Sequence, residues 1–273
     1  SHHLKQLTEF MCLLHSINDV FDKNIKTRAD MTEASAKKLN DFFLSLIENR
    51  SISPPKDLTP LLENTHVKLT LALIDSLRPY LQDPYFKEVF TESCQCKISS
   101  IPRKKSFDSS DIQHSPAILP IDEYIKVREK DSFGESLMVF ALSLIGVSLT
   151  KEFRQKNPYF GRLLGIVVKN INGITSYDND GVGAKREQAI GDPNNLVFSF
   201  MKEEELTMEQ AIDKVGSLND RLTSFYTAFL EYLDTHVDKG KLKGSKKDSA
   251  YECDRTTYLA AFDTIREIAY DYI

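Results

Sequence analysis

Residues 163–180 read LLGIVVKNINGITSYDND and combine a helical apolar pattern with three regularly spaced polar side chains. Asn172, Ser176 and Asp180 follow one another at intervals of four residues. An α-helix advances about 100° per residue, so the three side chains lie within an arc of about 80° on one face. Amide, hydroxyl and carboxylate oxygens are ligands that Mg²⁺ accepts. The pattern predicts a helix with a metal-binding face, and a solvated polar face is the alternative.

A second oxygen-rich patch lies near the start of the chain, at Asn18, Asp19 and Asp22. It follows the apolar run 10–17, in a pattern that suits the end of a buried helix. If the two patches face each other across a pocket, they could clamp a diphosphate through metal ions. The alternative is an ordinary solvent-facing acidic cluster.

The blocks between and after these patches carry a family resemblance. Residues 123–131 read EYIKVREKD, residues 191–197 read GDPNNLV, and residues 201–212 read MKEEELTMEQAI. Their order, together with the 44 residues from Arg128 to Asn172 (172 − 128), resembles the class I terpene synthases of the microbial type. The resemblance extends over residues 4–258. It implies an isoprenoid-synthase bundle of α-helices around a central apolar cavity.

Functional residues follow from this resemblance position by position. It implies about three Mg²⁺ ions completed by the substrate diphosphate, one of them on Asn172, Ser176 and Asp180, and the others on Asp22 with Asn18 or Asp19. The catalytic residues that it implies are Arg128, as diphosphate sensor, and Asp131 and Ser132, at a break in the following helix. The substrate-binding residues that it implies are Arg128, Arg186, Arg255, Tyr258, Phe21 and Phe140.

The chain departs from the family pattern at several positions. Asn18 stands where a metal-bridging carboxylate is usual, and Gly173 replaces an Asp within the second motif. Asp180 replaces the commoner Glu, and Arg255 is separated from Tyr258. Seventeen residues precede the first motif, where the family has several helices, so the sequence as given is expected to lack part of the usual N-terminal wall. These departures favour, as an alternative, a catalytically degenerate binding or scaffold protein of the same fold.

The apolar periodicity and the breaks predict an all-α fold in one domain, residues 1–273. The expected helices are 4–24, 32–48, 64–81, 84–94, 121–149 with an interruption near 132–134, 158–180, 207–237 and 249–273. The expected loops are a polar surface loop at 99–120, a glycine-punctuated loop at 181–195 and a lysine-rich loop at 239–247.

Composition excludes several classes of protein. The net charge of −5 over 273 residues leaves no broad basic surface for nucleic acid. No apolar run reaches the eighteen or so residues that span a bilayer, and no signal peptide is evident, so a cytoplasmic protein is expected. The family resemblance allows a homodimer.

One further motif competes for residues 176–187, which approximate the calcium loop of an EF-hand. Ser176 stands at the first position instead of Asp, and Gly183 stands where an aliphatic residue is normal. The pattern is therefore a weak match.

The sequence thus predicts a Mg²⁺-dependent terpene synthase, a lyase, that ionises a linear prenyl diphosphate, with farnesyl diphosphate the first choice, and cyclises the carbocation. A chain-elongating prenyltransferase is a second alternative, although that family carries two aspartate-rich motifs. On a solvated metal-binding face, Asn172→Ala or Asp180→Ala should change the free energy of unfolding by less than about 1 kcal/mol.

Overall fold

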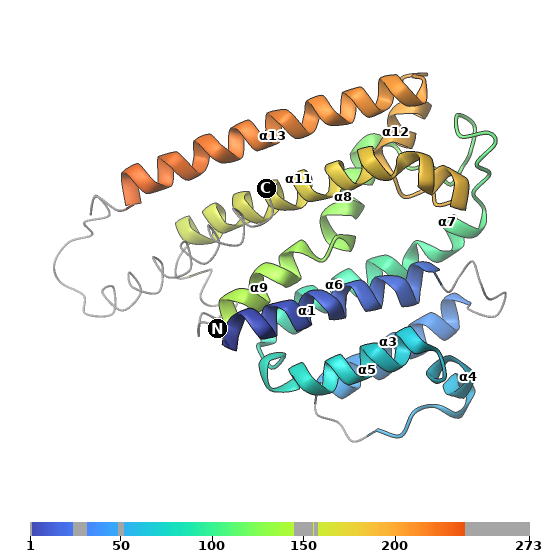
Figure 1. Cartoon of the computed structure of the whole chain (residues 1–273), viewed down its shortest axis with the longest axis vertical. Coiled ribbons are helices and arrows are strands. Elements are labelled where there is room, and N and C mark those ends of the chain that lie inside the picture. Colours follow the sequence, from blue (N-terminus) through green and yellow to red (C-terminus); the bar gives the residue numbers. More distant parts are fainter. Residues whose placement is uncertain (1, 24–31, 49–51, 145–154, 156–157, 238–273) are drawn as a thin grey trace.

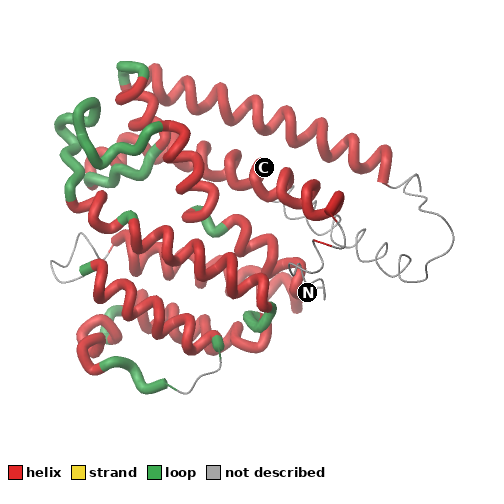
Figure 2. The backbone as a smooth tube through the Cα atoms, turned by 180° about the vertical axis from the view of Figure 1, so that it is seen from behind, coloured by secondary structure: helices red, strands yellow, loops and turns green. Residues whose placement is uncertain are grey.

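The structure, a computed structural model, describes residues 2–23, 32–48, 52–144, 155 and 158–237, and this part of the chain contains helices, turns and loops but no strand (Figures 1 and 2). The predicted all-α fold is confirmed. The elements are α1 (His2–Asn18), η1 (Asp19–Lys23), α3 (Glu33–Ile47), η2 (Lys56–Leu58), α4 (Thr59–Leu62), α5 (Thr65–Leu77), η3 (Arg78–Tyr80), α6 (Pro84–Ser99), α7 (Ile101–Lys105), α8 (Ile121–Asp131), α9 (Gly134–Leu144), α11 (Pro158–Ile190), α12 (Leu196–Glu203) and α13 (Met208–Val237).

The helices lie side by side in a bundle. In Figure 1, α3 and α5 lie along one side, α1, α6 and α9 lie in the middle, and α11 and α13 lie along the opposite side. Among the described residues, the larger apolar cluster joins α1, α3, α5, α6 and α9 with the first half of α11 and with Tyr226 of α13, and a smaller one joins α8, α11, α12 and α13. Stacked rings lie in the larger cluster, where Phe10 and Phe140 have ring centroids 4.1 Å apart. The predicted polar motif on α11 therefore lies where the two clusters meet along this helix, with Ile174 in the larger cluster and Ala184 in the smaller one.

Helix starts follow the capping signals in the sequence. Thr32 caps α3 in a reciprocal capping box with Ser35, which confirms the predicted start at that residue. Asn64 caps α5 and Asp83 caps α6. The side chain of each accepts hydrogen bonding from backbone N–H groups of the first turn, without the reciprocal bond of a capping box.

The predicted loop at 181–195 is wrong over its first ten residues, because α11 continues without a break to Ile190. Ala184 is fully buried against the smaller cluster, and a Cβ atom placed on Gly181 would lie 3.9 Å from Val215 Cγ1 of α13. Packing on α13 thus outweighs the low helix propensity of two glycines. The continuous helix also excludes the EF-hand, since residues 176–187 form no loop.

The predicted surface loop at 99–120 is also wrong in part. It contains the short helix α7, and several of its side chains are buried, including Ile112, Ser115 and Ile118. Lys202 Nζ of α12 donates to the carbonyl oxygens of Ser115 and Ile118, at 2.9 and 3.0 Å. The segment is therefore fixed against α12.

The remaining predicted elements can be compared with the structure in turn. The predicted interruption of helix 121–149 is found between α8 and α9. The predicted helix 207–237 is found as α13, whose buried side chains among the described residues include Ala211, Val215 and Tyr226, whereas Phe225 is exposed. The predicted helix 249–273 and the lysine-rich loop lie outside the described residues. Within the described part, no helix is both long and apolar enough to cross a membrane.

Candidate functional site

Asp180 lies at the centre of a buried polar network between α8, α11 and α12. Its Oδ2 atom accepts hydrogen bonds from the Tyr124 hydroxyl at 2.6 Å and from the Leu196 backbone N–H at 3.0 Å. Its Oδ1 atom accepts a hydrogen bond from Arg128 Nη2 at 3.1 Å. Three donors therefore satisfy this carboxylate within the protein.

The predicted triad faces the interior of the bundle. The exposed fractions of Asn172, Ser176 and Asp180 are 5 %, 3 % and 0 %. Burial raises the pKa of the Asp180 carboxyl, while Arg128 and the Tyr124 hydroxyl act to lower it. The alternative of a solvated polar face is thus excluded. The expectation that Asp180→Ala would change the free energy of unfolding by less than about 1 kcal/mol depended on a solvated face. Because Asp180 is buried, we now expect a clear loss of stability.

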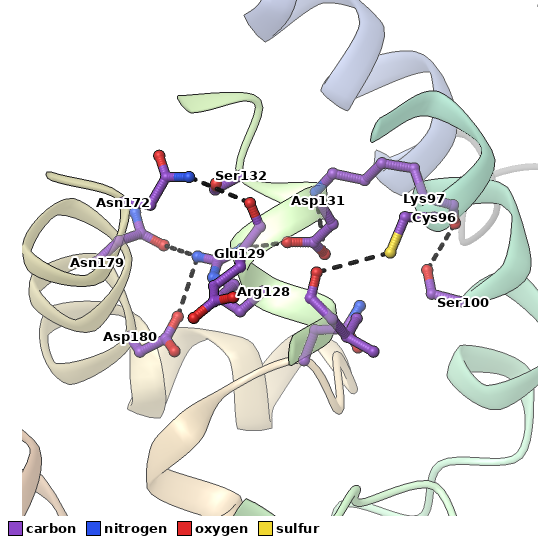
Figure 3. Close-up of polar contacts among 12 residues, drawn as sticks. Cys96, Lys97, Ser100, Arg128, Glu129, Asp131, Ser132, Asn172, Asn179 and Asp180 are labelled. Atoms are coloured by element: carbon purple, nitrogen blue, oxygen red, sulfur yellow. Dashed lines mark hydrogen bonds and ion pairs between the residues drawn. The ribbon is translucent and has the colours of Figure 1, made fainter. Parts of the chain in front are cut away.

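Arg128 on α8 connects the triad to the end of its own helix. Its guanidinium donates to Asp180, to Asn179 at 3.4 Å and to Asp131 Oδ1 at 3.3 Å (Figure 3). Burial acts to lower the pKa of Arg128, but Tyr124, Asp180 and Asp131 outweigh it and raise that pKa, so the cation is retained. Arg128 Nε is buried and has no hydrogen-bond partner within the described residues.

Asp131, the last residue of α8, is a second buried carboxylate at the site. It lies between two cations, with Arg128 Nη1 at 3.3 Å and Lys97 Nζ of α6 at 3.7 Å (Figure 3). The side chains of Lys97 and Asp131 are 6 % and 2 % exposed. The pair between Arg128 and Asp131 helps to orient the guanidinium, because the Asp131 carboxylate accepts a hydrogen bond from Nη1.

The break between α8 and α9 is shaped around Asn172. Phe133 has a φ of +60°, which is a strained conformation for an aromatic residue, and the Ser132 hydroxyl accepts a hydrogen bond from the Gly134 N–H at 3.4 Å. A Cβ atom on Gly134 would lie 1.3 Å from Asn172 Oδ1, so only glycine fits there. Asn172 Nδ2 donates to the Glu129 carbonyl at 3.1 Å. Asn172 is thereby held against the break that contains Ser132.

Sequence reasoning missed two residues that support the network from α11 and α12. Asn195 is fully buried and donates to the Asp180 carbonyl at 2.8 Å and to Glu187 Oε2 at 2.7 Å. Its own side-chain oxygen caps α12 by accepting the Val197 N–H. Burial raises the pKa of Glu187, and the Asn195 hydrogen bond opposes that rise. The sequence signal for Asn195 was its position as an N-cap before an apolar helix.

The first predicted motif lies in a different environment. Asn18 ends α1, and Asp19 begins the π-helical turn η1, which packs on α5 and α6. Asp19 Oδ2 lies 3.4 Å from His66 Nδ1 of α5, and both Asn18 and Asp19 are partly exposed. Helices α8 and α9 lie between α1 and α11 in Figures 1 and 2. The backbone of Asp22 is part of η1, and its side chain lies outside the description.

The remaining predicted residues are not gathered at the network. Phe21 and Phe140 are fully buried in the larger apolar cluster, where Phe140 packs against Phe10 and Phe86. Arg186 is exposed and pairs with Glu187 Oε1 at 3.2 Å. Arg255 and Tyr258 lie outside the described residues.

Comparison with known proteins identifies the chain. Residues 9–223 match the model of terpene synthase family 2, C-terminal metal binding. The chain belongs to this family. The match covers both predicted motifs and the blocks between them, so the predicted family is confirmed. No curated protein matches this chain.

Solved structures share the fold of this chain. A variant of cucumene synthase is 14 % identical with a TM-score of 0.60, and the alignment covers 100 % of this chain and 80 % of that chain. Isoprene synthase from grey poplar leaves (Populus x canescens) is 17 % identical with a TM-score of 0.54, covering 96 % and 43 %. A complex of isoprene synthase with three Mg²⁺ ions and dimethylallyl-S-thiolodiphosphate is 18 % identical with a TM-score of 0.53, covering 94 % and 42 %. This chain therefore spans less than half of the isoprene synthase chain.

The donor atoms of the triad fit a hard divalent cation in chemical type. Asn172, Ser176 and Asp180 offer amide, hydroxyl and carboxylate oxygens from one buried helix face. In the described residues no group of three or more His, Cys, Asp and Glu side chains could hold a metal ion, so the amide and the hydroxyl are needed. Asp180 Oδ2 already accepts two hydrogen bonds and Oδ1 one, so a cation beside the triad would share this carboxylate with protein donors.

Proposed function

We propose that this chain is a Mg²⁺-dependent terpene synthase that ionises a linear prenyl diphosphate, with farnesyl diphosphate the first choice, and cyclises the resulting carbocation. Membership of the family and the shared fold support a terpene synthase. The structure of isoprene synthase with Mg²⁺ ions and a diphosphate analogue supports the cofactor and the substrate class.

The observation that carries the proposal is the position of Arg128. This cation, whose side chain is 15 % exposed, lies between Asp131 and Asp180, and its Nε donor is unused within the described residues. A planar guanidinium can bind two phosphate oxygens at once, whereas an ammonium acts as a point charge. This position supports a role for Arg128 in binding a diphosphate beside the triad of α11.

We assign the following roles in the proposed reaction to the residues of this chain. Mg²⁺, when bound by Asn172, Ser176 and Asp180 and by the first motif, supplies positive charge for the diphosphate leaving group. Arg128 binds phosphate oxygens, and Asp131 with Lys97 fixes the direction of its guanidinium. Phe21 and Phe140 are proposed to contribute aromatic faces that stabilise the carbocation and to exclude water, and Arg186, Arg255 and Tyr258 remain proposed substrate contacts.

A degenerate binding or scaffold protein of the same fold is the second candidate. The hydrogen bonds on Asp180 favour this second candidate, because three protein donors already bind its carboxylate without a metal. A buried carboxylate held in this way serves to join α8, α11 and α12, whether or not the chain turns over a substrate.

Product analysis decides between these two functions. The full chain is incubated with Mg²⁺ and, separately, with geranyl, farnesyl and geranylgeranyl diphosphate, and the extract is analysed by gas chromatography. Metal-dependent terpene products, with farnesyl diphosphate the best substrate, are expected for the synthase. Absence of products from all three diphosphates, for a chain that unfolds cooperatively, would support the scaffold. Linear elongated prenyl diphosphates, formed when isopentenyl diphosphate is added, would indicate the prenyltransferase.

A further inference from the structure

Tyr124 is a buried residue that the predicted mechanism does not use. It lies on α8, is 2 % exposed, and packs in the apolar cluster of α8, α11, α12 and α13. Its hydroxyl lies 2.6 Å from Asp180 Oδ2, a length typical of a charge-assisted O–H···O⁻ bond. The packed ring therefore holds a strong donor against a predicted metal ligand.

The three donors to Asp180 differ in how they can be released. The Leu196 N–H belongs to the first turn of α12, which Asn195 caps, so this donor moves only with the helix. Arg128 bonds the other oxygen, Oδ1, and is itself held by Asp131. The Tyr124 hydroxyl is the neutral side-chain donor on Oδ2. It can turn away from Asp180 by rotation about single bonds.

On the basis of the proposed function, we propose that Tyr124 is a positioning residue that holds Asp180 in the protein network and so sets how tightly the triad binds a divalent cation. Oδ2 carries two of the three donors to Asp180, one of them the Tyr124 hydroxyl. A cation held by Asn172, Ser176 and Asp180 would compete with this hydrogen bond for the negative charge of the carboxylate.

The test measures cation binding directly. The full chain is titrated with Mn²⁺, and the free ion is followed by electron paramagnetic resonance. Tyr124→Phe keeps the buried ring and removes the competing donor, so Mn²⁺ should bind about tenfold more tightly, the size expected for one hydrogen bond to a charged group. Tyr80→Phe is the matched control, since it removes a hydroxyl that is bonded to Gln6, and it should leave Mn²⁺ binding unchanged.

Two further variants show whether the effect passes through Asp180. In an Asp180→Asn background, Tyr124→Phe should give no gain in Mn²⁺ affinity, because the carboxylate is gone. Replacement of Tyr124 by 3-fluorotyrosine keeps nearly the same shape and gives a more acidic hydroxyl, so it should weaken Mn²⁺ binding. This replacement also carries the test if Tyr124→Phe fails to fold.

The outcomes separate this inference from the proposed function. If the parent chain binds Mn²⁺ and neither Tyr124 replacement changes the affinity, the role of Tyr124 is wrong and the proposed function stands. A gain that persists in the Asp180→Asn background also overturns that role. If the parent chain itself binds no Mn²⁺, the role of Tyr124 is wrong, whereas the metal dependence in the proposed function, in which the substrate diphosphate completes the coordination, is decided by the product analysis.

Discussion

The two oxygen-rich motifs of this chain look alike in sequence and differ in structure. Asn172, Ser176 and Asp180 are buried in the middle of α11, whereas Asn18 and Asp19 are partly exposed at the end of α1. Hydrogen bonds from two other helices satisfy Asp180, while Asp19 lies near the half-exposed His66. The comparison teaches that the α11 motif is part of the packed interior, whereas Asn18 and Asp19 are expected to tolerate substitution with little loss of stability.

Replacing the acidic residue of each motif tests this difference most strongly. Asp180→Ala leaves the cation of Arg128 and the Tyr124 hydroxyl buried without their partner, so it should lower the free energy of unfolding by about 3–5 kcal/mol. Asp19→Ala removes a partly exposed pair and should cost less than about 1 kcal/mol. Urea denaturation measures both. Equal losses would remove the distinction between the motifs.

The sensor arginine gives the next largest effect, on activity. Arg128→Lys keeps the charge but loses the planar fork, so turnover of farnesyl diphosphate should fall by roughly 10- to 100-fold, which corresponds to the loss of one or two charged hydrogen bonds. Lys126→Arg, on the same helix, is the control for a change of cation outside the network. An Arg128→Lys variant as fast as the parent would remove Arg128 from diphosphate binding.

Gly134 provides a smaller and more local test. A Cβ atom would lie 1.3 Å from Asn172 Oδ1, so Gly134→Ala must displace the Asn172 side chain and should destabilise the fold by about 1–3 kcal/mol. Gly216→Ala on α13 is the matched control. Nothing lies within 4 Å of a Cβ atom there, so this change should stabilise the helix by about 0.5–1 kcal/mol. Thermal unfolding of both variants measures the two signs, and destabilisation of equal size would contradict the packing around Asn172.

The first motif should give the smallest change. Asn18→Asp adds a carboxylate beside Asp19 at a partly exposed helix end. If Asn18 occupies a metal-bridging position, the Mg²⁺ concentration for half-maximal activity should fall about fivefold. An unchanged or raised requirement would show that Asp19 or Asp22 supplies the bridge.

Sequence reasoning succeeded where the cause is local. The capping box of Thr32 and the break at Ser132 depend on residues within a few positions, and both are found as predicted. It failed at residues 181–190, where Gly181 and Gly183 indicated a loop. Packing on α13, about thirty residues further along the chain, keeps that segment helical.

In the candidate site, too, the local feature was predicted from the sequence and the feature that depends on packing was not. The regular spacing of the triad on one helix face follows from α-helical geometry and was correct. Its burial was not predictable, because the donors to Asp180 come from Tyr124 and Leu196, on helices that the spacing does not reveal. A pattern of polar residues gives the face that they share, and only the packed fold shows what that face contacts.

Ser176 allows the most direct test of the central claim that the α11 motif acts in diphosphate ionisation. Ser176 is buried in the triad, and the hydrogen bonds that hold Asp180 and Asn172 in the network do not involve it. Ser176→Ala should therefore leave the free energy of unfolding within about 1 kcal/mol. Release of pyrophosphate from farnesyl diphosphate with Mg²⁺ is measured for the parent, for Ser176→Ala and for Ser217→Ala, whose hydroxyl bonds only the Asp213 carbonyl of its own helix. Our account predicts a loss of about tenfold or more for Ser176→Ala and none for Ser217→Ala, and equal release by all three proteins would contradict it.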